Sequence, residues 1–204
     1  MYFLRFWNWI VFQEVLSKSH SLTLYYKIII FIKSSTLDEL SLSLVDWKND
    51  ENAMKFFKTQ TNLKKITLNE EYLYIIKYRE IIIHIFGNNL QLKTVVIKTY
   101  DGFESNIEDL SFLEGIINPS VENLEIGFDF TPNADEFVSA FTKLFPNVKN
   151  FTYRKYYDDD DDKEFIEIHN WKSLETINCR ISNINQFFGN IHLIEKLTTC
   201  TNHI

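Results

Sequence analysis

The sequence predicts an α/β solenoid in which short strand–helix units follow one another, with parallel strands side by side and helices outside. Two observations predict this fold: an apolar pattern that recurs at nearly constant spacing, and amphipathic segments between its copies. A third observation is that only 5 glycines and 3 prolines occur in 204 residues, with no cluster that would form a flexible linker. We therefore expect one continuous structure.

The recurring pattern is an apolar residue, two variable positions, a second apolar residue, one variable position and a third apolar residue. Its copies begin at Leu37, Leu63, Leu92, Val121, Val148 and Leu174, with a weaker last copy at Ile194. The first six copies start 26 to 29 residues apart, and the last starts 20 residues later. Because side chains of a strand alternate between its two faces, we expect positions one, four and six of each copy to be buried. Positions three, five and seven should then line the opposite face.

Helical patterns occupy the stretches between copies. Residues 133–145 place Phe137, Ala140, Phe141 and Leu144 on one apolar face, with Asn133 and Glu136 as a capping pair and Pro146 as the stop. A similar pair, Ser105 and Glu108, precedes Leu110, Leu113 and Ile117, and Pro119 closes that segment. Residues 52–57 and 75–86 are shorter or less regular helical candidates.

This pattern and spacing resemble those of leucine-rich-repeat proteins, over about residues 36–204. The resemblance implies a horseshoe with a parallel sheet on its concave face, short helices outside, and a role in binding another macromolecule. One column departs from the family. Position nine, where the family carries Asn or Cys to tie the loops, reads Val45, Glu71, Tyr100, Asp129, Tyr156, Ser182 and Asn202. Only Asn202 matches, so we expect that ladder of hydrogen bonds to be mostly absent. Irregular repeats of this length look most like those of F-box and other intracellular receptor proteins.

The amino-terminal segment carries a second resemblance. Residues 5–11 (RFWNWIV), followed by Ser17-Lys18-Ser19, are similar to the last helix of an F-box. The earlier F-box helices, which make most of the contact with the Skp adaptor, are missing from the sequence. We therefore expect residues 1–30 to form an amino-terminal cap, either the remnant of an F-box or an aromatic lid on the open end of the array. Residues 31–204 then form the leucine-rich-repeat array.

Composition narrows the function classes. A formal net charge of −7 argues against binding nucleic acid through its phosphates, and the acidic run 158–162 is typical of a solvated loop. Two cysteines are too few for a disulfide-rich secreted domain, and no apolar run approaches the roughly 20 residues that span a bilayer. These features favour a cytoplasmic or nuclear protein with no membrane partner.

No catalytic or metal-binding motif is present. The histidines lack paired spacing, no two cysteines form a metal motif, and the glycines are isolated rather than grouped in a phosphate loop. Cys179 occupies the third apolar position of its copy, which predicts a buried thiol rather than a nucleophile. We expect no cofactor, no metal and no enzymatic activity.

The predicted concave face carries the candidate binding residues. Position seven of the copies holds three cations and no anion, namely Lys98, Arg154 and Arg180, and we expect Lys65 to lie near them. We expect these four residues to form a basic strip that contacts an acidic partner segment, with an ordinary soluble sheet face as the alternative. The full predicted site is Lys65, Thr67, Val96, Lys98, Glu125, Arg154 and Arg180. Val96 and its small polar neighbours should leave room for a partner side chain.

Taken together, these features predict a non-catalytic protein-binding protein. By its resemblance to F-box leucine-rich-repeat proteins, it would be a substrate receptor that positions a target for a cullin–RING (SCF-type) ubiquitin ligase. The alternative is a stand-alone interaction scaffold with the same repeats and no ubiquitin role.

Overall fold

The sheet is parallel and its strands follow chain order. The computed structural model describes residues 21–25, 37–43, 50–69, 73, 76–98, 110–128, 134–155, 171–180 and 199–202. Within these residues one eight-stranded sheet runs in the order β1 to β8, and each strand pairs in parallel with the next. The strands are β1 Ser21–Tyr25, β2 Glu39–Ser43, β3 Lys65–Asn69, β4 Thr94–Lys98, β5 Asn123–Phe128, β6 Asn150–Lys155, β7 Thr176–Arg180 and β8 Thr199–Asn202. The α/β class expected from the sequence is confirmed.

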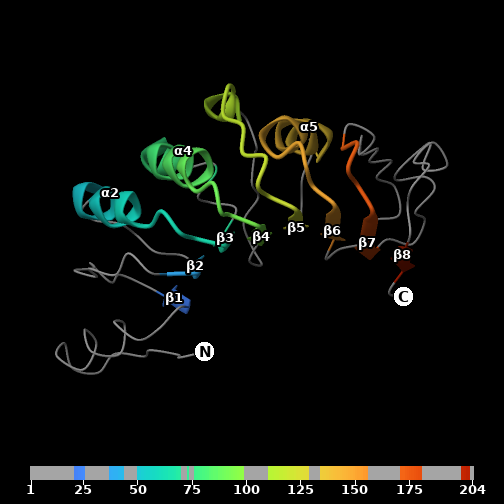
Figure 1. Cartoon of the computed structure of the whole chain (residues 1–204), viewed down its shortest axis with the longest axis horizontal. Helices are drawn as coiled ribbons and strands as arrows, with labels where there is room; N and C mark the ends of the chain where they lie inside the picture. The colour runs from blue at the N-terminus through green and yellow to red at the C-terminus, as the bar shows by residue number, and fades with distance from the viewer. Residues whose placement is uncertain are drawn as a thin grey trace.

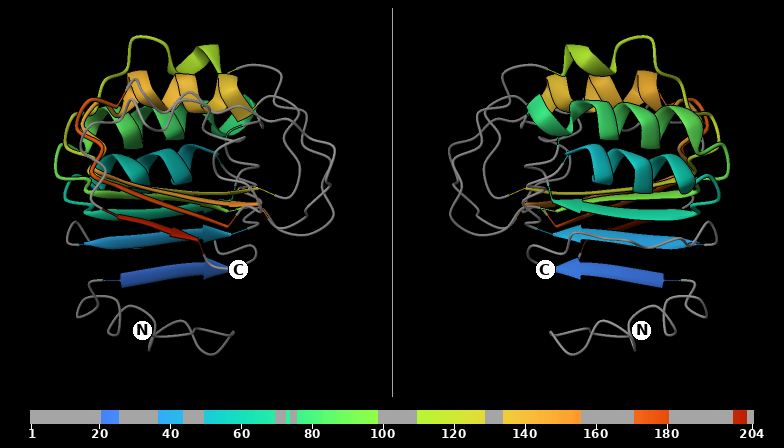
Figure 2. Two further views of the ribbon diagram at one scale, coloured as in Figure 1. Left: turned by 90° about the vertical axis from the view of Figure 1, so that its right-hand side faces the viewer. Right: turned by 90° about the vertical axis from the view of Figure 1, so that its left-hand side faces the viewer.

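Helices cover one side of this sheet. Before β3 lies α2 (Asp50–Thr59), before β4 lie η1 (Ile76–Tyr78) and α4 (Arg79–Asn88), before β5 lies η2 (Ser111–Leu113), and before β6 lies α5 (Ala134–Leu144). Figure 1 shows the strands along an arc with these helices on its convex side. Figure 2 shows the strands pointing in one direction beneath a single helical layer. Among the described residues, no helix is both long and apolar enough to cross a membrane.

The best-defined predicted helix is confirmed as α5. Phe141 and Leu144 are buried against the sheet, whereas Lys143 on the opposite side is exposed. In α4 the buried residues are Ile81, Ile82, Ile85 and Phe86, which form the core-facing stripe of an amphipathic helix. Residues 52–57 and 75–86, the weaker candidates, correspond to α2 and to η1 with α4.

The segment before β5 differs from the prediction. In its described part it forms only the short turn η2 instead of a helix that continues through Ile117. Gly115 follows with a φ of 81°, a left-handed conformation that favours glycine and ends a right-handed helix. Ile117 consequently lies outside the apolar face expected for it and is 62% exposed.

This short turn changes how the neighbouring helices pack. The Phe86 ring of α4 makes edge contacts with Phe141 and Phe145, at centroid distances of 6.4 and 5.2 Å. α4 and α5 belong to units that are separated by the η2 unit, so these ring contacts join two units that are not successive in the chain. Ile116 packs above Gly87, and the Arg79 guanidinium lies 5.0 Å from the centre of the Phe112 ring. The η2 unit therefore has a short turn where the adjacent units have a full helix, and aromatic contacts join those two helical units.

The predicted inward positions form the core. Position four of the copies is occupied by Leu40, Ile66, Val95, Leu124, Phe151 and Ile177, all at most 1% exposed. The strand register aligns these residues in one row across the sheet. Position one and the described residues of position six are also buried. Apolar burial of this kind stabilises by about 1.5–3 kcal/mol for each large side chain.

One backbone hydrogen-bond arrangement recurs where strands begin. The carbonyl of the residue at position two accepts two N–H groups of the next copy, from its positions two and three. This arrangement appears at five successive junctions, with N···O distances of 2.7 to 3.0 Å. The accepting carbonyls belong to Asp38, Lys64, Lys93, Glu122 and Lys149. The chain therefore repeats in backbone geometry as well as in its apolar pattern.

Buried amides tie the units together just before the strands. Asn118 Nδ2 donates to the carbonyls of Phe86 and Asn89 at 2.7 and 3.0 Å, and its own N–H donates to the carbonyl of Leu144. The equivalent residue one unit earlier is Asn89, whose Oδ1 accepts from the N–H of Leu63 and whose Nδ2 donates to the carbonyl of Ile85. Both asparagines are fully buried. Buried asparagines thus tie neighbouring units together three residues before the copies that begin at Leu92 and Val121, and the sequence pattern alone gives this position no role.

Several predictions fall outside the described residues. These are the F-box resemblance in residues 5–19, the capping pair at 105/108, Asn133 and the side chain of Glu136 from the second capping pair, and the acidic run 158–162. The side chains of the position-nine column, Asn202 included, lie outside them as well, as does that of Cys179.

Candidate functional site on the concave face

The concave face is the side of the sheet away from the helices, formed by positions three, five and seven of the copies (Figure 1). The register places each position in its own row across the strands. Row three runs Glu39, Lys65, Thr94, Asn123, Asn150, Thr176. Row five runs Ser41, Thr67, Val96, Glu125, Thr152, Asn178. Row seven runs Asn69, Lys98, Gly127, Arg154, Arg180.

Row seven contains three of the predicted cations. Lys98 is exposed, and the backbones of Arg154 and Arg180 are direct partners in adjacent strands. Strands in a sheet are about 4.8 Å apart, so this pairing brings two arginine backbones close together at one end of the face. The side chains of both arginines lie outside the described residues. Gly127 separates Lys98 from Arg154 and leaves that position of the row without a side chain.

Lys65 does not join this row. It pairs in register with Thr94, four residues before Lys98 on the same strand. At about 3.3 Å per residue, the two lysine backbones are separated by roughly 13 Å along the strand direction, in addition to the step between strands. The expectation that Lys65 lies near the row-seven cations is therefore corrected: it lies at the opposite end of the face, because position within a copy decides the row.

The structure also corrects the expectation for Val96. Its side chain is only 5% exposed, although strand alternation places it opposite the core, and it is not part of the core cluster. Register puts it between Thr67 and Glu125, both half-buried. The sheet curves toward this side (Figure 1). On the inside of such a curve, the side chains of neighbouring strands lie closer together than on a flat sheet. Val96 therefore offers almost no surface to a partner.

Row three carries a chain of side-chain hydrogen bonds. Asn150 Nδ2 donates to Asn123 Oδ1 at 2.7 Å. Asn123 Nδ2 in turn donates to Thr94 Oγ1 and to the Lys93 carbonyl, each at 3.3 Å. The two amides are thus held in fixed orientations on the surface of the sheet. We name Thr94, Asn123 and Asn150 the amide ladder.

Sequence reasoning identified these residues as surface positions and assigned them no function. The signal that could have revealed the ladder is the same amide residue at the same position of two successive copies. Whether two such amides reach each other depends on the parallel register, which the sequence leaves open.

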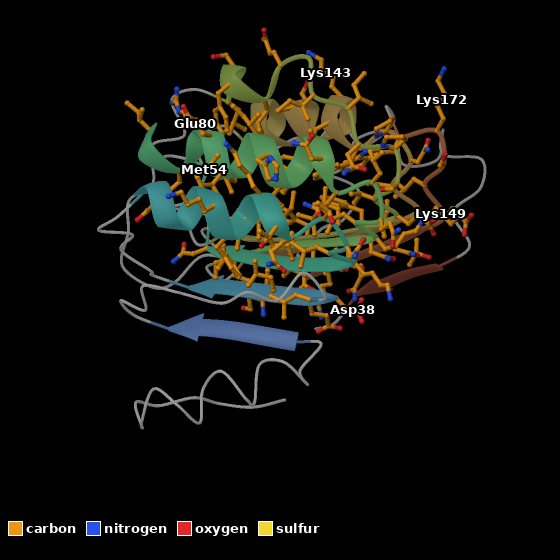
Figure 3. All side chains as sticks on the ribbon, turned by 60° about the vertical axis from the view of Figure 1, so that its left-hand side comes forward. Asp38, Met54, Glu80, Lys143, Lys149 and Lys172 are labelled. Atoms are coloured by element: carbon orange, nitrogen blue, oxygen red, sulfur yellow. The ribbon has the colours of Figure 1, made fainter. Side chains whose placement is uncertain are left out.

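Charges line the edge of the sheet where the strands begin. Glu122 pairs with Lys93 at 2.8 Å and with Lys149 at 3.3 Å, and Lys64 pairs with Asp38 at 3.0 Å. Figure 3 shows Asp38 and Lys149 along this edge, with Glu80 and Lys143 in the helical layer. Hydrogen bonds from Lys93 and Lys149 lower the pKa of the Glu122 carboxyl below its ordinary value. Salt bridges thus offset the charges beside the amide ladder.

One histidine lies between two helices. Its surroundings lower the pKa of His84, first through burial and second through the positive charge of Lys58 on α2, with a smaller opposing effect from the Phe57 carbonyl. His84 Nδ1 lies 3.0 Å from Asn88 Nδ2, a geometry in which a neutral ring accepts the hydrogen bond. Across the described ranges, no group of three or more His, Cys, Asp or Glu residues could hold a metal ion.

Comparison with known proteins returned no match: no family model, no curated protein and no solved structure is similar to this chain.

Proposed function

We propose that this chain is a non-catalytic protein-binding module of the leucine-rich-repeat type, which holds a segment of another protein on its concave face. The observation that carries the proposal is the repeated geometry: six copies of the pattern align in one parallel register, with the same bifurcated carbonyl contact at five junctions. Repeats that stack in this way expose an extended curved sheet, the surface that solenoid proteins use for binding.

The charge distribution supports an acidic partner. Row seven contributes Lys98, Arg154 and Arg180, whereas the whole chain has a net charge of −7. Clustered cations in a negatively charged protein attract an acidic segment and raise its rate of association. The partner-binding residues proposed are these three, with Glu125 and Thr67 as half-buried neighbours in row five.

A role as substrate receptor of an SCF-type ubiquitin ligase would add a second contact. That role depends on the F-box resemblance in residues 5–19. The stand-alone scaffold, which is the alternative, needs the concave face only.

The test uses tagged full-length chain and two triple variants with equal changes of charge. Lys98→Glu with Arg154→Glu and Arg180→Glu alters row seven. Lys55→Glu with Lys143→Glu and Lys172→Glu alters exposed lysines of the helical side and the turns. Proteins bound in cell lysate are quantified by mass spectrometry, and circular dichroism verifies folding. We expect the row-seven variant to lose acidic partners that the control retains. Equal recovery by both variants would contradict binding on this face.

Deletion of residues 1–30 separates the two roles. Recovery of the Skp adaptor and a cullin with the full chain, and their loss on deletion, would establish the ligase receptor. Partners that are unaffected by the deletion, with no adaptor recovered, would leave the stand-alone scaffold.

A further inference from the structure

The amide ladder has hydrogen-bonding groups left over after its internal contacts. An asparagine side chain offers two N–H donors and two acceptor lone pairs. Asn150 uses one N–H on Asn123, and Asn123 Oδ1 accepts only that one bond. Within the described residues, one N–H of Asn150 and one lone pair of Asn123 Oδ1 remain, on two atoms that are 2.7 Å apart. Asn150 is exposed and Asn123 is half-exposed, so both groups face solvent.

This donor and acceptor match the main chain of an extended polypeptide. In an extended conformation the N–H and C=O of one residue point to the same side of the chain. The N–H of such a residue would donate to Asn123 Oδ1, and its C=O would accept from Asn150 Nδ2. The hydrogen bonds to Thr94 Oγ1 and the Lys93 carbonyl already fix the plane of the Asn123 amide, so less side-chain freedom is lost on binding.

The electrostatics of the row favour a neutral ligand group. From Thr94 to Thr176 row three carries no charge. At the adjacent edge, Glu122 is salt-bridged to both Lys93 and Lys149, so these three residues keep one net positive charge outside the row. A peptide group is polar and uncharged, whereas a phosphate or a carboxylate would meet no cation in this row between β4 and β7. The cations proposed to contact the partner lie in row seven, four residues further along the strands, and the cation of row three is Lys65 on β3.

We infer that Asn123 and Asn150 bind the main chain of an extended partner segment, while row seven contacts its acidic side chains. This inference rests on the proposed function and adds the chemistry by which the partner is held. The ladder contributes affinity that depends little on the partner's sequence, and row seven contributes the preference for acidic residues.

The probe is a phage-displayed library of random 12-residue peptides, selected on the full-length chain. A synthetic peptide from the selection is measured by fluorescence anisotropy against Asn123→Leu with Asn150→Leu. Asn150→Asp, which replaces the donor with a further acceptor, is the second variant, and Thr152→Val in the neighbouring row is the control. Because two hydrogen bonds are lost, we expect affinity to fall about tenfold or more in the double variant and to stay within about twofold in the control.

Main-chain methylation identifies the contact on the peptide. Replacing one peptide N–H at a time by N–CH3 should weaken binding to the wild-type chain at one residue, with no further loss in the Asn123→Leu, Asn150→Leu variant. If binding depends on the row-seven charges and not on the two asparagines, this inference is wrong and the proposed function stands. If binding depends on neither, or if no peptide is enriched, the proposed contact with an extended segment on this face fails.

Discussion

On the helix-covered face, position four of every strand from β2 to β7 holds an apolar residue that is almost completely buried. On the concave face, row five of the same strands holds serine, threonine, valine, glutamate and asparagine. Both faces share one backbone and one register, and they differ only in what they contact. The comparison shows that burial restricts the residues of one face to a single chemical class, whereas the other face can vary without altering the fold.

Leu124→Asp is expected to have the largest effect. Leu124 lies in the middle of the core row, so the variant removes apolar contacts and buries an unpaired carboxylate. We expect a loss of at least about 4 kcal/mol, enough to abolish the cooperative thermal transition in circular dichroism.

The control for Leu124→Asp lies on the concave face of the next strand. Thr152→Asp introduces the same carboxylate at a half-exposed position and should lower stability by no more than about 1 kcal/mol. Similar unfolding of both variants would show that the two faces are not distinguished by burial.

Two asparagine variants compare the same two environments, buried and exposed, with an intermediate expected loss of stability. Asn118→Ala leaves the buried carbonyls of Phe86 and Asn89 without a donor, so we expect a loss of about 2 to 4 kcal/mol. Asn123→Ala removes contacts on the surface, where water replaces them, and should cost about 0.5 kcal/mol. Urea denaturation of the two variants measures the difference. Equal losses would mean that the buried amide column does not hold the units together.

The smallest effect is a dependence on pH at Glu122, on the edge between the two faces. Since the folded state lowers the pKa of Glu122, its salt bridges stabilise the fold above the ordinary glutamate pKa. This contribution is lost as the pH falls through the lower folded-state value. Glu122→Gln should therefore lose less stability than the wild type between pH 7 and acid, and the difference should shrink in high salt because the pair is exposed. If the urea midpoints of the wild type and of Glu122→Gln changed equally with pH, the salt bridges of Glu122 would not contribute to the pH dependence of stability.

The sequence predicted the helix of one segment correctly and that of a neighbouring segment incorrectly. Residues 133–145 carry a complete apolar stripe and a proline stop, and α5 follows them closely. The segment before β5 carries a similar start signal, but Gly115 adopts a left-handed conformation and the described part forms only η2. An isolated glycine is compatible with several conformations, so its effect depends on the packing of Ile116 over Gly87 and of Phe112 against Arg79.

The candidate site also has features that the sequence predicts and features that it does not. The rows of the concave face follow from the spacing of the copies, because alternation along a strand assigns each position to a face. The separation of Lys65 from the basic row also follows from the sequence, because Lys65 occupies position three and the row-seven cations occupy position seven. The low exposure of Val96 depends instead on how neighbouring strands curve around it, and that curvature is not encoded in one copy alone.

By itself, the sequence determined the number and order of the core positions, since a repeated apolar pattern has one efficient way to bury its residues: parallel strands in chain order. The tertiary structure decided which polar groups meet. Asn118 reaches the Phe86 carbonyl of α4, the Phe86 ring reaches Phe141 of α5, and Asn150 reaches Asn123. Those contacts join residues 27 or more positions apart, and they arise only when the parallel strands stack in register, with neighbouring strands about 4.8 Å apart.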